Sequence, residues 1–157
     1  MHPNGWAGMD YWVKVADQDR PALRDWRLMQ MKQERAGFTK AQKEQLSFYA
    51  RIAGCLRERG IACVVLVPPF HEEVVKQIQS LPECVAAYRQ WRHYLDAIFP
   101  NVVDLSSSSY GVATNFYKSD PLHFRSEIAV QMLNTEVIPV ALRILGQKTN
   151  GVAAFAK

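Results

Sequence analysis

The residues best suited to chemistry lie in one short stretch near the C-terminal end, Tyr117-Lys-Ser-Asp-Pro-Leu-His-Phe124. Asp120 and His123 stand three positions apart in it. An imidazole can take the proton of a serine hydroxyl, and a neighbouring carboxylate fixes the ring tautomer and stabilises the imidazolium. Asp120 also has a plainer interpretation, because Asp followed by Pro121 suits the N-cap and first position of a helix. Both interpretations stay open at this point.

A nucleophile for such a pair is harder to find. The run Ser106–Ser109 lies between two predicted elements, and a serine cluster in a loop is usually solvated turn sequence. We therefore expect no replacement nucleophile there, although a serine at an unorthodox position or on a partner chain stays open as the alternative. His71 follows Pro68-Pro69-Phe70 and is expected in the first turn of a helix, with a pocket-lining role as its alternative.

No metal site and no cofactor are predicted. The three cysteines form no CxxC pair, and the four histidines show no metal-ligand spacing with them. The cysteines stand among apolar residues, which favours buried reduced thiols in a reducing compartment: Cys55, Cys63 and Cys84.

The composition is typical of one globular domain. A length of 157 residues suits a single domain, 1–157, with a poorly defined segment at 1–20 and a tail at 146–157. Apolar residues make up 48% and charged residues 22%, which excludes a disordered chain. No apolar run approaches the roughly 18 residues of a membrane span. No basic stretch followed by an apolar one opens the chain, so we expect no signal peptide and a cytoplasmic protein.

The net charge of +4 is unevenly distributed. Residues 1–60 carry 11 Lys and Arg against 7 Asp and Glu, whereas the remaining residues carry 8 of each. There is no basic run and no aromatic–basic repeat to turn this surplus into a binding surface. Nucleic acid is therefore not favoured as a partner.

Hydrophobic periodicity predicts helices that alternate with short strands. The first helix should bury Leu23, Trp26 and Met29 or Gln30, and Gly37 should end it. The second should begin at Thr39 and end at Gly60, which suits the position after a helix. The predicted helices cover residues 20–35, 39–59, 71–81 and 83–99.

Two short β-branched runs, 61–67 and 101–105, predict strands buried on both faces, and residues 11–15 form a weaker candidate. Strands that alternate with helices are usually parallel. The expected fold class is therefore α/β, a partial three-layer parallel sheet of two or three strands flanked by helices. A complete doubly wound sheet has about five strands, so the chain corresponds to half of one.

The last helix is expected to start at Pro121 and to reach Leu145. Pro139 should kink or split this helix, because proline has no N–H for the helical hydrogen bond. The tail from Gly146 should fray.

Several motifs match one family in order: Leu56–Ile61, Val64–Pro69, Val102–Ser106, Phe116-Tyr117 and Asp120–Phe124. Together they resemble the C-terminal half of SGNH (GDSL-like) hydrolases, in the branch related to bacterial polysaccharide O-acetyltransferases. The resemblance covers roughly residues 39–145. It implies a flavodoxin-like, SGNH-type fold, with His123 as general base and Asp120 as the residue that orients it.

The other blocks of that family have no counterpart in the chain. The Gly-Asp-Ser nucleophile block, the oxyanion-hole glycine block and the Gly-x-Asn-Asp block are absent, and we expect them upstream of Met1. The resemblance thus implies the base and the orienter but not the activity. We expect a truncated module, as gene fragmentation or a mobile element would produce, although relatives are often exported. The alternative is an esterase or O-acyltransferase that uses His123 and Asp120.

Half of a sheet leaves a strand edge and apolar surface uncovered. Open strand edges favour pairing with another chain, and large apolar patches favour partners. We therefore expect a homodimer, in which a sheet is completed across a two-fold axis, or an unknown protein partner.

Overall fold

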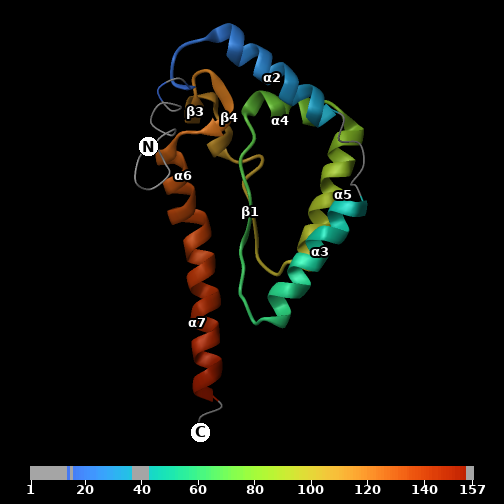
Figure 1. The fold of residues 1–157 in the computed structure, drawn as a ribbon, viewed down its shortest axis with the longest axis vertical. Coiled ribbons are helices and arrows are strands. Elements are labelled where there is room, and N and C mark those ends of the chain that lie inside the picture. Colours follow the sequence, from blue (N-terminus) through green and yellow to red (C-terminus); the bar gives the residue numbers. More distant parts are fainter. Residues whose placement is uncertain (1–13, 15, 37–42, 155–157) are drawn as a thin grey trace, which may run out of the picture.

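The computed structural model describes residues 14, 16–36 and 43–154. These residues form a mostly helical structure with two small sheets, which confirms the mixed α/β class (Figure 1). One sheet is parallel and the other antiparallel, and each has two strands within the described residues. The weak strand candidate at 11–15, apart from residue 14, falls outside the described residues, as do Gly37 and Thr39.

Helix α3, Lys43–Glu58, ends at the glycine that the sequence predicts. Gly60 has a φ of 64°, in the left-handed region that other residues rarely adopt. Its N–H donates to the carbonyl of Arg57 at 3.0 Å, and the N–H of Ile61 donates to that of Leu56 at 2.9 Å. These two bonds form a Schellman motif, which satisfies carbonyls that the helix leaves open.

The parallel sheet pairs β1, Val65–Val67, with β2, Val102–Asp104, and Val65 stands opposite Val102. Both strands are shorter than the predicted runs, and most of their residues are only partly buried. The prediction of strands buried on both faces is therefore wrong. Helix α3 and helix α5, Pro82–Ile98, pack on the sheet through one core: Ala53, Val67, Leu95 and Phe99.

Helix α2, Pro21–Ala36, lies against α4, Glu72–Gln79, through a face other than the predicted one. The buried cluster consists of Leu28, Met31 and Val74, with Ile78 packed against it. Trp26 and Met29 are about half exposed, at 50% and 49%. The apolar residues of α2 occupy more than one face of the helix, and packing against α4 decides which of them are buried.

The segment after β2 replaces the predicted helix start with a hairpin. Two 3₁₀ turns, Ser109–Gly111 and Ala113–Asn115, lead into β3, Phe116–Tyr117, which pairs antiparallel with β4, Asp120–Phe124. The prediction that Asp120 caps a helix starting at Pro121 is therefore wrong. Tyr117 stands opposite Asp120 across the turn, and Pro121 is fully buried in this short strand. The helix that follows starts five residues later, at Ser126.

Helix α6, Ser126–Met132, a π-helical turn, Leu133–Val137, and α7, Ile138–Ala154, follow one another directly and form the long rod in Figure 1. The prediction that Pro139 disturbs the helix is confirmed, because the π-turn stands just before it and accommodates the missing N–H donor. The sequence predicts a frayed tail from Gly146, whereas α7 continues to Ala154 in the structure.

Much of this rod is exposed and apolar. By length and composition alone, Ser126–Gly146 could cross a membrane, with 6% of its most apolar window buried. This helix differs from the sequence-based expectation that no apolar run approaches the length of a membrane span. Such a helix is weak evidence for a membrane span, because the core helix of a soluble protein has a similar composition. The exposed large side chains on it are Val130, Leu133, Ile138, Leu142 and Leu145.

Candidate functional site

The hairpin brings the two predicted site residues into contact. Nδ1 of His123 lies 3.0 Å from Oδ2 of Asp120, a normal hydrogen-bond distance. The two side chains differ sharply in exposure, because the carboxylate is 2% exposed and the imidazole 61% exposed. This is the geometry of a largely exposed imidazole oriented by a buried carboxylate.

Asp120 is held from two further directions. The backbone N–H of Leu122 donates to Oδ1 at 3.2 Å, as in an Asx turn. Nη1 of Arg27 lies 2.9 Å from Oδ2 and 3.4 Å from the carbonyl oxygen of Ser119. The carboxylate therefore has a peptide donor, an arginine and an imidazole around it. Asp120 thus does not cap a helix, and its side chain instead closes a local turn within β4.

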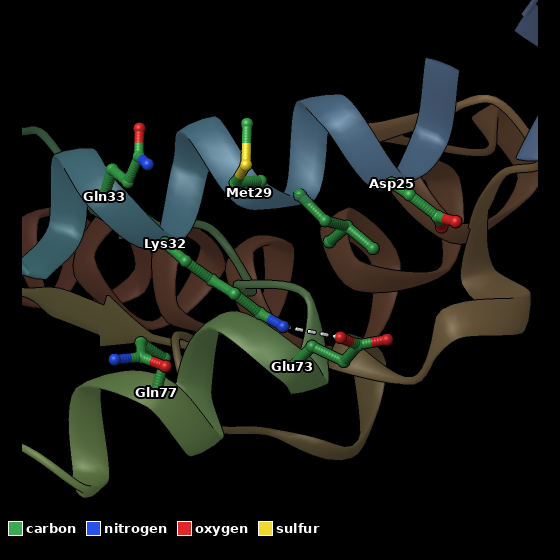
Figure 2. Close-up of a pocket in the computed structure, with 7 residues that line it drawn as sticks. Asp25, Met29, Lys32, Gln33, Glu73 and Gln77 are labelled. Carbon is green, nitrogen blue, oxygen red and sulfur yellow. Dashed lines mark hydrogen bonds and ion pairs between the residues drawn. The ribbon is translucent and has the colours of Figure 1, made fainter. Parts of the chain in front are cut away.

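Arg27 reaches the hairpin because α2 is fixed on α4. Leu28, its neighbour in sequence, is buried in the cluster with Val74. One turn further along α2, Nζ of Lys32 lies 2.7 Å from Oε2 of Glu73 on α4, as Figure 2 shows. Figure 2 also shows the hollow, about 440 Å³, that runs between the two helices around this ion pair. The apolar cluster and the ion pair together set the position of α2 over β4.

The hairpin is also tied to the chain that precedes α2. The backbone N–H and the Oγ hydroxyl of Ser119 both donate to the carbonyl of Ala16, at 3.0 and 2.9 Å. Just beyond β4, Nη2 of Arg125 lies 2.6 Å from Oδ1 of Asp17, and the same guanidinium lies over the ring of Tyr117. The turn that carries Asp120 is thus fixed by its surroundings on both sides.

His71 combines both roles that the sequence left open for it. It is the N-cap of α4, and its Nδ1 accepts a hydrogen bond from the backbone N–H of Glu73 at 3.3 Å. Burial lowers the pKa of His71, against the opposing effect of two neighbouring glutamates. A hydrogen-bond acceptor at Nδ1 requires a neutral ring that carries its proton on Nε2, and the lowered pKa favours the neutral form. His71 is therefore a structural cap that also lines a hollow beside the hairpin.

That hollow has a volume of about 510 Å³ and mixed charge. Its charged lining consists of Asp19, Arg24, Lys118 and Arg125. Arg24 is paired with Asp25 and Arg125 with Asp17, so most of the positive charge is already balanced. The lining therefore does not select an anionic ligand.

The candidate serines form hydrogen bonds away from His123. Ser106 is buried, and its Oγ accepts a hydrogen bond from the phenol of Tyr88 at 2.6 Å. Ser108 donates to the carbonyl of Leu105 at 2.7 Å, while Ser107 and Ser109 are exposed. The Ser108 hydroxyl, which already donates to a backbone carbonyl, is not positioned to give its proton to an imidazole. The expectation that the run supplies no nucleophile remains a prediction.

Ser106 belongs to a second polar cluster, at the carboxyl end of β2. Oδ2 of Asp104 accepts from Arg92 at 2.9 Å and from Tyr88 at 3.1 Å, and the backbone N–H of Ser106 donates to Oδ1 at 3.0 Å. Partial burial raises the pKa of Asp104, but the hydrogen bonds from Ser106, Tyr88 and Arg92 outweigh it and leave that pKa below its ordinary value. Burial raises the pKa of Tyr88 to about 12.

The expectations about metal and cysteine have different outcomes. Within the described residues, no group of three or more His, Cys, Asp or Glu side chains could hold a metal ion. Cys84 is buried, as predicted, and burial raises its thiol pKa. Cys63 is partly buried against the sheet core. Cys55 is exposed, so the prediction of three buried thiols is wrong for it.

Sequence reasoning singled out Asp120 and His123, which the structure brings into contact, but gave no signal for Arg27. Its contact joins a helix near one end of the chain to a hairpin near the other, and nothing in the local sequence signals such a pairing. The hairpin was missed as well, because Asp-Pro before an apolar run favours a helix start. No protein-family model, no curated protein and no solved structure matches the chain.

Proposed function

We propose that the chain is a non-catalytic module that corresponds to the C-terminal half of an SGNH-type hydrolase domain and acts by self-association or by binding a protein partner. The observation that carries this proposal is the Asp120–His123 pair, in which a buried carboxylate lies 3.0 Å from an exposed imidazole. This pair is the base and orienter of a hydrolase triad. The order of motifs between residues 39 and 145 supports the same relationship.

We propose a non-catalytic module because of how the serines of the chain are placed. Residues 1–157 contain no Gly-Asp-Ser block. Ser119, next to Asp120, donates its hydroxyl proton to the carbonyl of Ala16, and Ser106 is bound within the Tyr88 cluster. An oriented imidazole without a serine to deprotonate gives no acyl transfer of the triad type.

Two surfaces support association as the mode of action. Within the described residues, β1 pairs with β2 alone, so its other edge is available to a further strand. The helix from Ser126 to Gly146 exposes five large apolar side chains, and a stable monomer rarely exposes so many along one element. Helices α3 and α5 pack on the parallel sheet, and in the view of Figure 1 the α6–α7 rod stands across β1 from them. A second copy of the chain is the partner we propose first.

Ester turnover tests the catalytic part of the proposal. Purified protein, His123→Ala and His93→Ala are compared with p-nitrophenyl acetate. His93 is an exposed histidine on α5 and controls for the general reactivity of surface imidazoles toward this ester. We expect equal, background-level rates for all three proteins. Turnover that is lost in His123→Ala alone would overturn the proposal.

The oligomeric state tests the association part. Light scattering across micromolar concentrations should show a dimer, and Leu142→Ser should shift it toward monomer because it removes apolar surface from the exposed side of α7. A matched control is Ala86→Ser, which changes an exposed position on α5. A clean monomer in the unmodified protein would contradict self-association and leave a different protein as the partner.

The second candidate function is an esterase or O-acyltransferase. The 61% exposure of the His123 ring favours it, since a serine on another polypeptide could approach the imidazole. In this case His123 is the base, Asp120 orients it, and the nucleophile comes from a partner chain or an unorthodox position. Turnover that appears in an oligomer and vanishes on dilution to monomer would favour this candidate over the first.

A further inference from the structure

The first turn of α4 joins this helix to two other elements. The backbone N–H of Ala113, in the second 3₁₀ turn, donates to Oε1 of Glu72 at 3.0 Å. Oε2 of Glu73 lies 2.7 Å from Nζ of Lys32 on α2. The next residue, Val74, is fully buried in the cluster that docks α2 on α4. Three consecutive residues of one helical turn therefore hold α2 and the segment before β3.

This turn is capped by an imidazole. Nδ1 of His71 accepts from the backbone N–H of Glu73 at 3.3 Å, and the carbonyl of His71 accepts from the N–H groups of Val74 and Val75 at 2.8 and 3.1 Å. The ring is 3% exposed and lies against the ring of Phe116 on β3, with 5.1 Å between the centroids. The ring thus satisfies a donor that a helix start leaves open, at a place where water has little access.

Histidine differs from the usual N-cap residues because its acceptor can be lost by titration near neutral pH. The side-chain oxygens of serine, threonine and asparagine accept at any pH, whereas an imidazolium carries a proton on both nitrogens and accepts nothing. A positive charge at a helix N-terminus also opposes the helix dipole. Protonation of His71 would therefore remove the cap and place an unfavourable charge at the same point.

The surroundings of His71 favour its neutral ring. Burial has the largest effect on its pKa and lowers it from the ordinary value of 6.5. Glu73 and Glu72 on α4 act in the opposite direction, while Lys32 and Arg24 on α2 lower the pKa further. Three more charged groups line the hollow beside the ring: Asp19, Lys118 and Arg125.

We propose that His71 is an acid-sensitive cap: when its ring is protonated, the first turn of α4 opens and α2 loses its fixed position on α4. The pKa of His71 is lower in the folded state than in the unfolded state, so the stabilisation is present above pH 6.5 and is lost as pH falls through the lower folded value. The core on the parallel sheet is built by α3, α5 and the strands, so the effect should reach α2 before this core. The switch requires neither a nucleophile nor a partner and stands apart from the proposed function.

A pH titration followed by NMR tests this directly on the unmodified protein. Spectra between about pH 7.5 and about pH 4.5 report the ring of His71, the amide of Glu73, the methyl groups of Leu28 on α2 and those of Leu95 in the sheet core. We expect the amide of Glu73 and the methyl groups of Leu28 to change with the same midpoint as the ring, below pH 6.5. The methyl groups of Leu95 should stay constant through that midpoint.

His71→Asn is the matched variant, since the asparagine oxygen is a good N-cap acceptor and does not titrate. His93→Asn removes an exposed histidine of α5 and serves as the control. Over the same acidification, the unfolding equilibrium constants of the unmodified protein and of His93→Asn should rise more than that of His71→Asn, by at least about fivefold, the effect of losing one N-cap. Urea titrations at each pH measure these constants.

Three results would overturn the proposal. One is an acid sensitivity of His71→Asn equal to that of the unmodified protein, which would assign the effect to other groups. Another is a protonated His71 ring beside an unchanged Glu73 amide, because the turn would then not need the acceptor. The third is a simultaneous change at Leu28 and Leu95, which would indicate general unfolding. If His71→Asn fails to fold, the titration of the unmodified protein still decides between these outcomes.

Discussion

Asp104 and Asp120 each pair with an arginine, yet they build different clusters. Asp104 ends β2, and its partners are Arg92, Tyr88 and Ser106. Asp120 begins β4, and its partners are Arg27, His123 and the N–H of Leu122. The Asp104 side chain is 23% exposed and that of Asp120 is 2% exposed.

The two clusters differ in how the polar groups around the aspartate are hydrogen-bonded and exposed. In the Asp104 cluster the phenol of Tyr88 and the backbone N–H of Ser106 are donors, and the Ser106 hydroxyl accepts from the phenol. The Asp120 cluster ends in an imidazole that is 61% exposed. The first arrangement stabilises the loop after β2, whereas the second holds a largely exposed imidazole against a buried carboxylate. An acid beside an arginine is thus not informative by itself, because the remaining partner decides the chemistry.

Removal of each carboxylate should give the largest contrast. Asp120→Ala leaves Arg27 without its buried partner and should lower the free energy of unfolding by about 3 kcal/mol. Asp104→Ala acts at a more exposed site and should lower it by about 1 kcal/mol. Urea unfolding of both variants measures the two values. Equal losses would show that the burial of Asp120 does not set it apart.

The Asp104 cluster should respond to alkaline pH through Tyr88. The pKa of Tyr88 is raised to about 12, above its ordinary value of 10.0, so the folded state holds the phenol proton more tightly than the unfolded state. This stabilisation is present below the unfolded pKa and is lost as pH rises from about 10 toward about 12. Near neutral pH the free energy of unfolding of Tyr88→Phe should be about 1 kcal/mol lower than that of the unmodified protein. Over the alkaline window it should fall less than that of the unmodified protein, because the variant has no phenol to titrate. Urea midpoints at several pH values test this, and parallel curves for the two proteins would contradict it.

The same cluster should respond to acid with the opposite sign. The pKa of Asp104 lies below its ordinary value of 3.8, so its ionised form is favoured in the folded state. That contribution is present above pH 3.8 and is lost as pH falls through the lower folded value. Asp104→Asn should therefore lose less stability than the unmodified protein between pH 5 and pH 2. Thermal unfolding at stepped pH measures the difference, which would be absent if Asp104 titrates alike in both states.

Ser106→Ala should give the smallest effect on activity. Its hydroxyl is bound to Tyr88, so its removal should cost about 1 kcal/mol of stability and leave the background rate of ester hydrolysis unchanged. Rate measurements with p-nitrophenyl acetate beside a urea titration test both parts. A lower ester rate would mean that Ser106 reaches His123 in solution and that the two clusters act together.

The parts of the fold that depend on local signals could be predicted from the sequence. The end of α3 at Gly60 follows from a residue type, and the parallel pairing of β1 with β2 follows from alternation of strands and helices. The break before Pro139 follows from its missing donor. Each of these features is set by a few neighbouring residues.

The features that tertiary packing decides could not be predicted in this way. Asp120-Pro121 carries a helix-start signal, yet the pairing of β4 with β3 and the burial of Pro121 override it. The inner face of α2 follows from its contact with α4, which buries Leu28 in place of Trp26. For the site, the Asp120–His123 spacing was readable because both residues lie on one short segment. Arg27 was not, because its contact joins distant parts of the chain.

The central claim is that an oriented base is present and that no serine in the chain acts with it. Labelling with a fluorophosphonate, which forms a stable adduct with an activated serine, tests this most directly when followed by intact-mass and peptide analysis. We predict no serine adduct in the unmodified protein above the level found in His123→Ala. One stoichiometric serine adduct that disappears in His123→Ala would contradict the account and would identify the missing nucleophile.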